Sequence, residues 1–509
     1  MVKIAGGALL ASIAIDRKSS QTISTQIYAA IRKMIFSEVL RAGERLPSSR
    51  TLALELDVSR TTINYVFERL TEEGLIDSRT GAGSFVCETL GSHLQKLPAP
   101  STDMLARRRD NLRLSRDIEQ AMDRFVPRIP HEKRAFTTGM PAFDSFPMAQ
   151  WSRLISRHYR EKRDMVMGYG DPEGYFPLRR AIANHLRANR GLACEPGQVF
   201  IVSGAQQAFN LNCAVLLNPG DKAWFENPGA IGARNSLSAH GIDIVPVPVD
   251  GEGLCVEEGL KRAPYFRLAF VTPSHQQPMG ATMSLARRIA LLQAAEQNDA
   301  WILEDDYDGE FRYRRSPIPT LQSLDASQRV IYIGTFSKSL SPALRLGYCV
   351  VPPILVDVFG KISGAFLHGA PTSLQAVLAD FMDEGHFASH IRRMCKVYAA
   401  RHDALIDAAA RRLAGLLQVE PTETGFHTIG RLAQGFDENS VCELARERGI
   451  SVSPLGRYCI EPIAERGLVL GFSAVRPPEI KAGVETLAQV LESLRPESPP
   501  QSARRLRKT

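Results

Sequence analysis

Apolar residues in the first 90 positions recur with helical spacing, and short polar turns separate them into three segments. Within residues 21–36 five apolar side chains fall on one face of a helix: Ile23, Ile27, Ile31, Met34 and Ile35. A second helix is expected over residues 50–57, with Ser48 and Ser49 as candidate N-caps, and a third over residues 60–74, capped by Ser59. Residues 75–88 then predict two short strands around a glycine-rich turn. Three helices followed by a hairpin are typical of a winged helix-turn-helix.

Beyond residue 135 the pattern changes to short, continuous apolar runs that end in polar clusters. ILEDDYDGEF begins at residue 302, and VIYIG, at residues 330–334, leads into Thr335 and Lys338. Both runs predict buried parallel strands, whose carboxyl ends face ligands in open α/β sheets. The expected fold is therefore multidomain: an α+β winged helix, then an α/β domain that ends in a small α/β lobe at about residues 415–495.

Composition and charge set the expected boundaries of these domains. We expect an N-terminal extension (1–20), a winged helix (21–89), a linker (90–134), the α/β domain (135–495) and a basic tail (496–509) whose composition is that of a disordered segment. The chain has a formal net charge of +7, and most of the excess lies in the linker and the tail. Basic flexible segments fit contact with a polyanion, although solvated basic runs, such as the three arginines at 107–109, are common without one.

The distribution of cysteines and apolar residues indicates the cellular compartment in which the chain functions. The eight cysteines are scattered without a CxxC pair, which argues against a disulfide framework or a zinc site and favours a reducing cytoplasm. We therefore expect no metal. The apolar run Ile4–Ile15 is interpreted as a segment that packs on the winged helix rather than as an export signal. No run reaches the ~20 apolar residues that cross a bilayer, so no membrane partner is expected.

One set of side chains near the predicted strand ends has a specific chemical meaning. Asp305 and Tyr307 end the first run, Lys338 follows the second, and Arg345 stands seven residues later. A lysine forms a Schiff base with an aldehyde, a carboxylate holds a pyridinium protonated, a phenol bonds a ring hydroxyl, and an arginine pairs with phosphate. These are the needs of pyridoxal 5′-phosphate (PLP). The alternative is a strand that ends in acids beside an unrelated surface lysine.

These motifs resemble a known family. Residues 135–495 resemble the fold-type I PLP-dependent aminotransferases, and EDDYD together with TFSKSLSPALRLGY resembles the aminotransferase-like half of MocR-type regulators in the GntR family. The resemblance implies that Lys338 is the catalytic Schiff-base lysine and that Tyr169 reaches the phosphate of a partner subunit's cofactor. It also implies a set of cofactor-binding residues: Tyr169, Ser203, Gly204, Ala205, Gln206, Gln277, Asp305, Tyr307, Thr335, Lys338 and Arg345. The amides at the predicted helix N-terminus after Ser203 suit a phosphate.

The N-terminal segment resembles the GntR DNA-binding domain along its whole length, from AGERLPSSRTLALELDVSRTTINYVFERLTEEGLI to GAGSFV. Carried over by position, seven residues are expected to face double-stranded operator DNA: Arg50, Ser59, Arg60, Thr61, Thr62, Asn64 and, at the wing tip, Gly81. The polar residues suit phosphate and base-edge hydrogen bonds in the major groove. The alternatives are a winged helix that binds protein and, for Ser59, a capping role alone.

Three positions differ from working aminotransferases. Ala230 stands where the family usually has an aromatic residue on the ring, Gln277 where it has an asparagine, and Val469 where many members carry the arginine that binds the substrate carboxylate. A buried carboxylate needs a cationic partner. Arg457 and Arg476 are the candidates to replace that arginine, and the sequence does not choose between them.

The sequence therefore favours a PLP-binding transcriptional regulator over an active aminotransferase with a DNA-binding domain or a regulator that has lost PLP. As implied by the resemblance, we expect a head-to-tail homodimer. The expected effector is PLP itself, as in the vitamin B6-sensing, PdxR-like branch, or an amine or amino acid that reacts with PLP.

Overall fold

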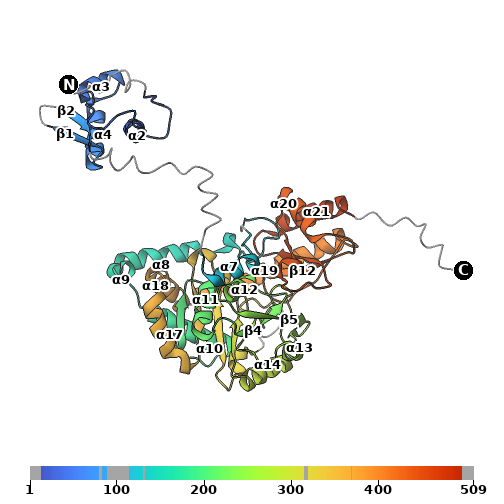
Figure 1. Ribbon diagram of the computed structural model, residues 1–509. Helices are drawn as coiled ribbons and strands as arrows, with labels where there is room; N and C mark the ends of the chain where they lie inside the picture. The colour runs from blue at the N-terminus through green and yellow to red at the C-terminus, as the bar shows by residue number, and fades with distance from the viewer. Residues whose placement is uncertain are drawn as a thin grey trace. The chain divides into compact units, whose positions relative to one another are not determined.

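The computed structural model describes residues 13–79, 83–88, 114–129, 132–313, 319–367 and 369–495. They belong to two compact units: unit 1, Met1–Arg113, and unit 2, Leu114–Thr509 (Figure 1). Gly81, the arginines at 107–109 and the tail from residue 496 lie outside the described residues. In the described part of the chain, no helix combines the length and the apolar character that a membrane span requires.

Unit 1 is a winged helix-turn-helix, as predicted. Its elements are α2 (Ile23–Phe36), α3 (Ser49–Glu55), α4 (Arg60–Glu72) and the antiparallel strands β1 (Ile76–Arg79) and β2 (Gly83–Val86). The side chains of Thr22, Ser48 and Ser59 cap the three helices by accepting a backbone N–H three residues on. The predicted apolar faces meet in one buried core, on which Ile13 and Ile15 also pack.

Unit 2 is built around an eight-stranded sheet in the order β3-β10-β9-β8-β7-β4-β5-β6. The strands are β3 (Val199–Val202), β4 (Lys222–Asn227), β5 (Asp243–Asp250), β6 (Gly253–Leu254), β7 (Leu268–Val271), β8 (Trp301–Asp305), β9 (Val330–Thr335) and β10 (Gly347–Val350). The five strands β9, β8, β7, β4 and β5 run parallel, whereas β10 is antiparallel to both of its neighbours. The two sequence runs at 302 and 330 are thus adjacent parallel strands.

Helices cover both faces of this sheet, which explains why its strands are continuously apolar. In β9, Ile331 and Ile333 pack into one buried cluster while Tyr332 packs into another. The helices of this part are α8 (Met148–Glu161), α9 (Arg163–Met167), α10 (Phe176–Arg190), α11 (Ala205–Leu216), α12 (Ile231–Ala239), α13 (Val256–Arg262), α14 (Leu285–Gln297), α15 (Leu321–Leu324), α16 (Phe336–Ser339), α17 (Val356–Ile362), α18 (Thr372–Asp383) and α19 (His386–Arg412). The last three of these, α17, α18 and α19, lead from β10 towards the small lobe.

The small lobe follows α19 and carries its own antiparallel sheet, drawn in orange and red in Figure 1. Its strands, in the order β11-β12-β14-β13, are β11 (Leu417–Val419), β12 (His427–Leu432), β13 (Ser453–Pro454) and β14 (Gly467–Gly471), with helices α20 (Glu438–Glu447) and α21 (Pro477–Ser493). Residues 114–129, which the sequence assigns to a linker, belong to unit 2, where α7 (Arg116–Ala121) packs against α12.

Candidate functional site

A cavity of about 500 Å³ opens at the carboxyl ends of β8 and β9. Nine of the eleven predicted cofactor residues line it: Gly204, Ala205, Gln206, Gln277, Asp305, Tyr307, Thr335, Lys338 and Arg345. Ser203 and Tyr169 are not among its lining residues. Because parallel strands end at the same edge of a sheet, groups more than a hundred residues apart in the chain are brought together here.

Strand alternation decides which acid of the EDDYD motif faces the cavity. Asp305, the last residue of β8, lines the cavity, and its buried Oδ1 has no hydrogen-bond partner among the described residues. Burial, followed by the charges of Asp306, Asp308 and Glu226, raises the pKa of Asp305 well above its ordinary value. A buried carboxylate without a partner is costly. This oxygen is therefore suited to receive a cationic donor from a ligand.

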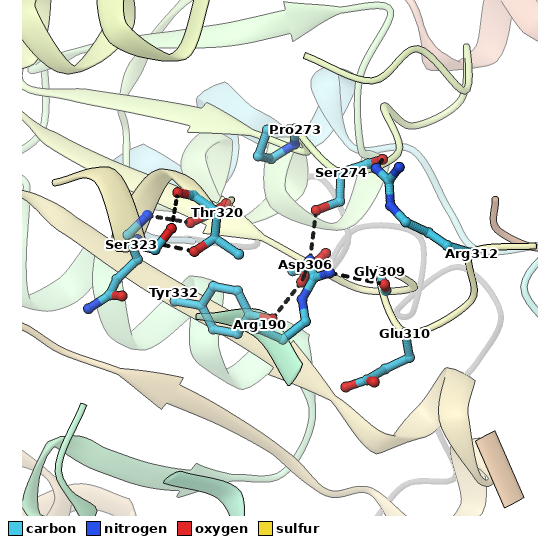
Figure 2. Close-up of polar contacts among 12 residues, drawn as sticks. Arg190, Pro273, Ser274, Asp306, Gly309, Glu310, Arg312, Thr320, Ser323 and Tyr332 are labelled. Atoms are coloured by element: carbon cyan, nitrogen blue, oxygen red, sulfur yellow. Dashed lines mark hydrogen bonds and ion pairs between the residues drawn. The ribbon is translucent and has the colours of Figure 1, made fainter. Parts of the chain in front are cut away.

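Asp306, the next residue, supports the structure instead (Figure 2). Its Oδ2 accepts from the Arg190 guanidinium and, at 2.5 Å, from the Tyr332 hydroxyl. Arg190 also donates to Ser274 Oγ at 3.0 Å and to the Gly309 carbonyl at 3.2 Å. Burial alone would raise the pKa of Asp306, but the Arg190 charge and the hydrogen bonds hold it below its ordinary value. This fully buried pair fixes the loop after β8.

Tyr307 belongs to a buried network that the sequence analysis missed. His275 Nδ1 lies 2.7 Å from Asp308 Oδ2 and 3.1 Å from the Tyr307 hydroxyl. The ring of His427, which also lines the cavity, lies 4.9 Å from that of His275, and its Nε2 lies 3.1 Å from the Pro278 carbonyl. The available signal was the strand end AFVTPSHQQPMG, where His275 stands two residues before Gln277. The network holds the Tyr307 phenol in place beside Asp305.

Lys338 lies in α16, directly after β9, and is half-buried against the cavity. Its Nζ donates to the Gly139 carbonyl at 2.7 Å. Burial and then the nearby charge of Arg128 lower the pKa of this lysine to about 8. An amine with such a pKa has a substantial neutral fraction near neutral pH, which is the form that attacks a carbonyl.

Another part of the cavity wall is suited to an anion. Ala205 and Gln206 begin α11, so their backbone N–H groups have no partner within the helix. Gly204 caps the helix with φ of 92°, a conformation that favours glycine, and a side chain built there would approach the Arg345 guanidinium to 3.9 Å. Thr335 also lines the cavity. Ser203 differs, because its amide already donates to Gln207 Oε1 at 2.6 Å.

The three departures from the aminotransferase pattern all line the cavity: Ala230, Gln277 and Val469. Val469, in β14, is buried in an apolar cluster with Ile429, Leu455 and Tyr458. Of the two arginines proposed to replace the missing cation, Arg457 lines the cavity. Arg476 does not, because it is paired with Asp144 at 2.9 Å.

In unit 1 the predicted DNA-facing residues gather around the start of α4. Arg50, Ser59, Arg60, Thr61 and Asn64 are exposed and Thr62 is partly exposed. Ser59 Oγ accepts the Thr62 backbone N–H at 3.1 Å, so Ser59 has the capping role that the sequence left open. Tyr65, at 56% exposure, is an aromatic residue on the same helix that the sequence analysis did not single out.

Tyr169 lies in the loop between α9 and α10, and its side chain is fully exposed, at 101%. A Cβ at the next residue, Gly170, would stand 2.1 Å from Thr372 Oγ1, so the loop needs glycine there to approach α18. Met167, at 70%, and Phe176, at 55%, are exposed on either side of Tyr169 in the sequence. Large exposed apolar side chains are frequent at contact surfaces.

Comparison with known proteins identifies both units. Residues 135–466 match the family "Aminotransferase class I and II", and residues 23–86 match "Bacterial regulatory proteins, gntR family". The chain is 37% identical to the "Probable rhizopine catabolism regulatory protein MocR" of Rhizobium meliloti, over 95% of this chain and 96% of that protein. It is 28% identical to the pyridoxine biosynthesis transcriptional regulator PdxR of Corynebacterium glutamicum, over 91% and 94%.

Among solved structures, the chain is similar to LysN, an α-aminoadipate aminotransferase of Thermus thermophilus, crystallised with N-(5′-phosphopyridoxyl)-L-leucine. The TM-score is 0.66 and the identity 28%, over 70% of this chain and 92% of LysN. The regulators match both units, whereas this enzyme covers a smaller share of the chain.

Proposed function

Because this chain belongs to the MocR subfamily of GntR-type transcriptional regulators, we propose that it holds PLP in the unit 2 cavity as the cofactor of a sensor and binds operator DNA through unit 1. The full-length relatives named above are regulators rather than aminotransferases. The site of action would be the cytoplasm, where bacterial DNA lies. The observation that carries the cofactor proposal is the unpartnered, buried oxygen of Asp305 in the cavity that contains Lys338.

The residues present fit PLP at each of its polar groups. Asp305 would receive the pyridinium N–H, and Tyr307 and Gln277 would lie at the ring hydroxyl. Lys338 would hold the aldehyde carbon. The phosphate would be bound by the start of α11 and by two further side chains, Thr335 and Arg345. A cationic pyridinium next to Asp305 removes the cost of burying that carboxylate alone, so cofactor and site stabilise each other.

PLP supplies an aldehyde that exchanges one primary amine for another. The chain's own residues prepare this exchange. Lys338, with a pKa lowered to about 8, would offer the aldehyde a larger neutral, nucleophilic fraction than an ordinary lysine does. The His275–Asp308 pair orients the Tyr307 phenol. Ala230, which has no aromatic ring to stack on the cofactor, and Val469, which offers no charge, support a sensor more than a catalyst.

The test is Lys338→Ala, with the exposed Lys361→Ala as a matched control. We expect Lys338→Ala to lose the visible absorbance of the bound cofactor and the borohydride-fixed label at this lysine, with an unchanged melting temperature of the apo protein. Lys361→Ala should keep both. A label at wild-type stoichiometry in Lys338→Ala would show that another lysine carries the cofactor.

The second candidate function, an aminotransferase with an added DNA-binding domain, is favoured by the presence of Asp305, Tyr307, Lys338 and Arg345 in one cavity. Steady release of an oxo acid from an amino acid over many turnovers would support it. One equivalent per subunit, without turnover, would support the sensor.

For the partners, we propose that α4 enters the major groove of an operator with Arg50, Arg60, Thr61 and Asn64, which are exposed. We also propose a head-to-tail homodimer formed through unit 2, supported by the exposed Tyr169 and its apolar neighbours. A dimer presents two winged helices to a repeated half-site. Footprinting shows whether the protected site is repeated, and a single unrepeated site would contradict this arrangement.

A further inference from the structure

The segment Val126–Ile129, called the strap here, contributes Arg128 and Ile129 to the lining of the cavity. Asn235, on α12, holds it by a reciprocal pair: the Val126 N–H donates to Asn235 Oδ1 at 3.1 Å, and Asn235 Nδ2 donates to the Val126 carbonyl at 2.9 Å. On the small-lobe side, the Arg457 guanidinium donates to the Pro127 carbonyl. The strap is therefore fixed to both lobes of unit 2.

This arrangement places two arginines on the same wall. The carbonyl that accepts from Arg457 belongs to the peptide bond between Pro127 and Arg128, so the two residues are neighbours in space. Both line the cavity, together with Lys338. Within the described parts of the chain, neither guanidinium forms an ion pair with a carboxylate. Each has five N–H donors, and the bond to Pro127 uses only part of the capacity of Arg457.

A third arginine positions Arg457. Arg234, on α12, is 7% exposed and donates to the Cys459 carbonyl at 2.9 Å and to the Arg457 carbonyl at 3.4 Å. It thereby fixes the turn that carries Arg457. Arg234 also has no acidic partner among the residues that the structure describes. Burial, and then the charge of Arg457, lower the pKa of Arg234, as expected where cations gather without an anion.

Part of the cavity lining near Arg457 is apolar. Val469, Tyr458 and Ile231 line the cavity and pack in one cluster with Met279. These apolar neighbours strengthen the attraction between the half-buried Arg457 and an anion, because water competes less for the charges, whereas Arg128 is exposed. Arg345, beside Gly204, would bind the phosphate of PLP. The second cationic part of the lining, Arg128 and Arg457, is therefore available to bind a different anion.

We propose that Arg128 and Arg457 bind the carboxylate of an amino acid effector whose amino group points to Lys338. The proposal rests on the PLP function above and names its ligand class. The sequence analysis left open whether the effector is PLP itself or an amine or amino acid, and this proposal chooses the amino acid. The strap follows α7, the first helix of unit 2, so the ligand would contact the N-terminal part of unit 2.

The experiment titrates the PLP-loaded, full-length protein by calorimetry with four probes: L-alanine, β-alanine, γ-aminobutyrate and n-butylamine. At least one amino acid should bind at least tenfold more tightly than n-butylamine, because an arginine–carboxylate hydrogen bond contributes about 1.5–3 kcal/mol, and 1.4 kcal/mol is tenfold. Arg128→Gln and Arg457→Gln should each remove most of this preference and leave n-butylamine binding unchanged. Arg476→Gln, an exposed arginine outside the cavity, is the control.

Several results would overturn the subsite. Equal binding of n-butylamine and all three amino acids by wild type would do so, as would an unchanged preference in both cavity variants or an equal loss in Arg476→Gln. The visible absorbance of the cofactor is recorded in every titration. If wild type takes up no PLP, the proposed function itself fails, whereas PLP uptake without carboxylate preference refutes only the subsite. Should one variant not fold, the other, more than 300 residues away in the chain, decides the outcome.

Discussion

Asp305→Asn should change the free energy of unfolding and the PLP affinity in opposite senses. In the apo protein the carboxylate is buried, unpartnered and surrounded by other acids, which raise its pKa. A carboxyl group whose folded pKa is raised makes the fold less stable as the pH rises through that pKa. Removing the charge should therefore raise the melting temperature of the apo protein at pH 7–8 and flatten its dependence on pH.

The PLP-bound protein should respond in the other direction. The contact between a carboxylate and a pyridinium N–H is a hydrogen bond between charged groups, with a contribution of about 1.5–3 kcal/mol. Asparagine lacks the charge, so the PLP dissociation constant should increase roughly 10- to 150-fold. Melting curves of the apo protein and absorbance titrations with PLP measure the two effects separately.

Asp306→Asn is the matched control at the next residue, directly after β8. It leaves the buried Arg190 guanidinium without its acidic partner, which typically costs about 3–5 kcal/mol, so the apo protein should melt at a lower temperature. The reasoning is refuted if Asp305→Asn destabilises the apo protein as Asp306→Asn does, or if it leaves PLP affinity unchanged.

Three further predictions concern separate parts of the chain. Apo protein should capture PLP faster as the pH rises, with a midpoint at about 8, because Lys338 must be neutral to react; a midpoint above 10 would contradict the lowered pKa. Arg60→Ala should weaken operator binding by about 1–3 kcal/mol with the PLP absorbance unchanged, measured by titration at matched salt; wild-type affinity would remove Arg60 from the interface. Tyr169→Ala should weaken PLP binding roughly tenfold or more without lowering the melting temperature of the apo protein, since Tyr169 is fully exposed in its own chain. If light scattering shows that the variant is a dimer and its PLP affinity is unchanged, Tyr169 does not bind the cofactor across the subunit boundary.

The sequence by itself determined the elements and the chemistry that depends on short spacings. Ser48 and Ser59 cap their helices independently of the tertiary packing. The side chain of each accepts a hydrogen bond from a backbone N–H only three residues further on. The strands at 302 and 330 are apolar on both faces because helices cover both sides of the sheet. The predicted cofactor residues come mainly from three strand ends, and parallel strands bring such ends to one edge of a sheet.

Only the tertiary structure decided which side chains contact one another at that edge of the sheet. The sequence analysis chose Asp305 from its place in the motif, and the structure shows that Asp305 lines the cavity while Asp306 pairs with Arg190. His275 meets Asp308 across 33 positions, and Arg457 meets the strap across 330. Contacts of this kind depend on how separate elements pack, and local spacing carries no record of them. For the same reason, the sequence showed that the family's arginine is missing at Val469. It did not show that Arg128 and Arg457 both line the cavity.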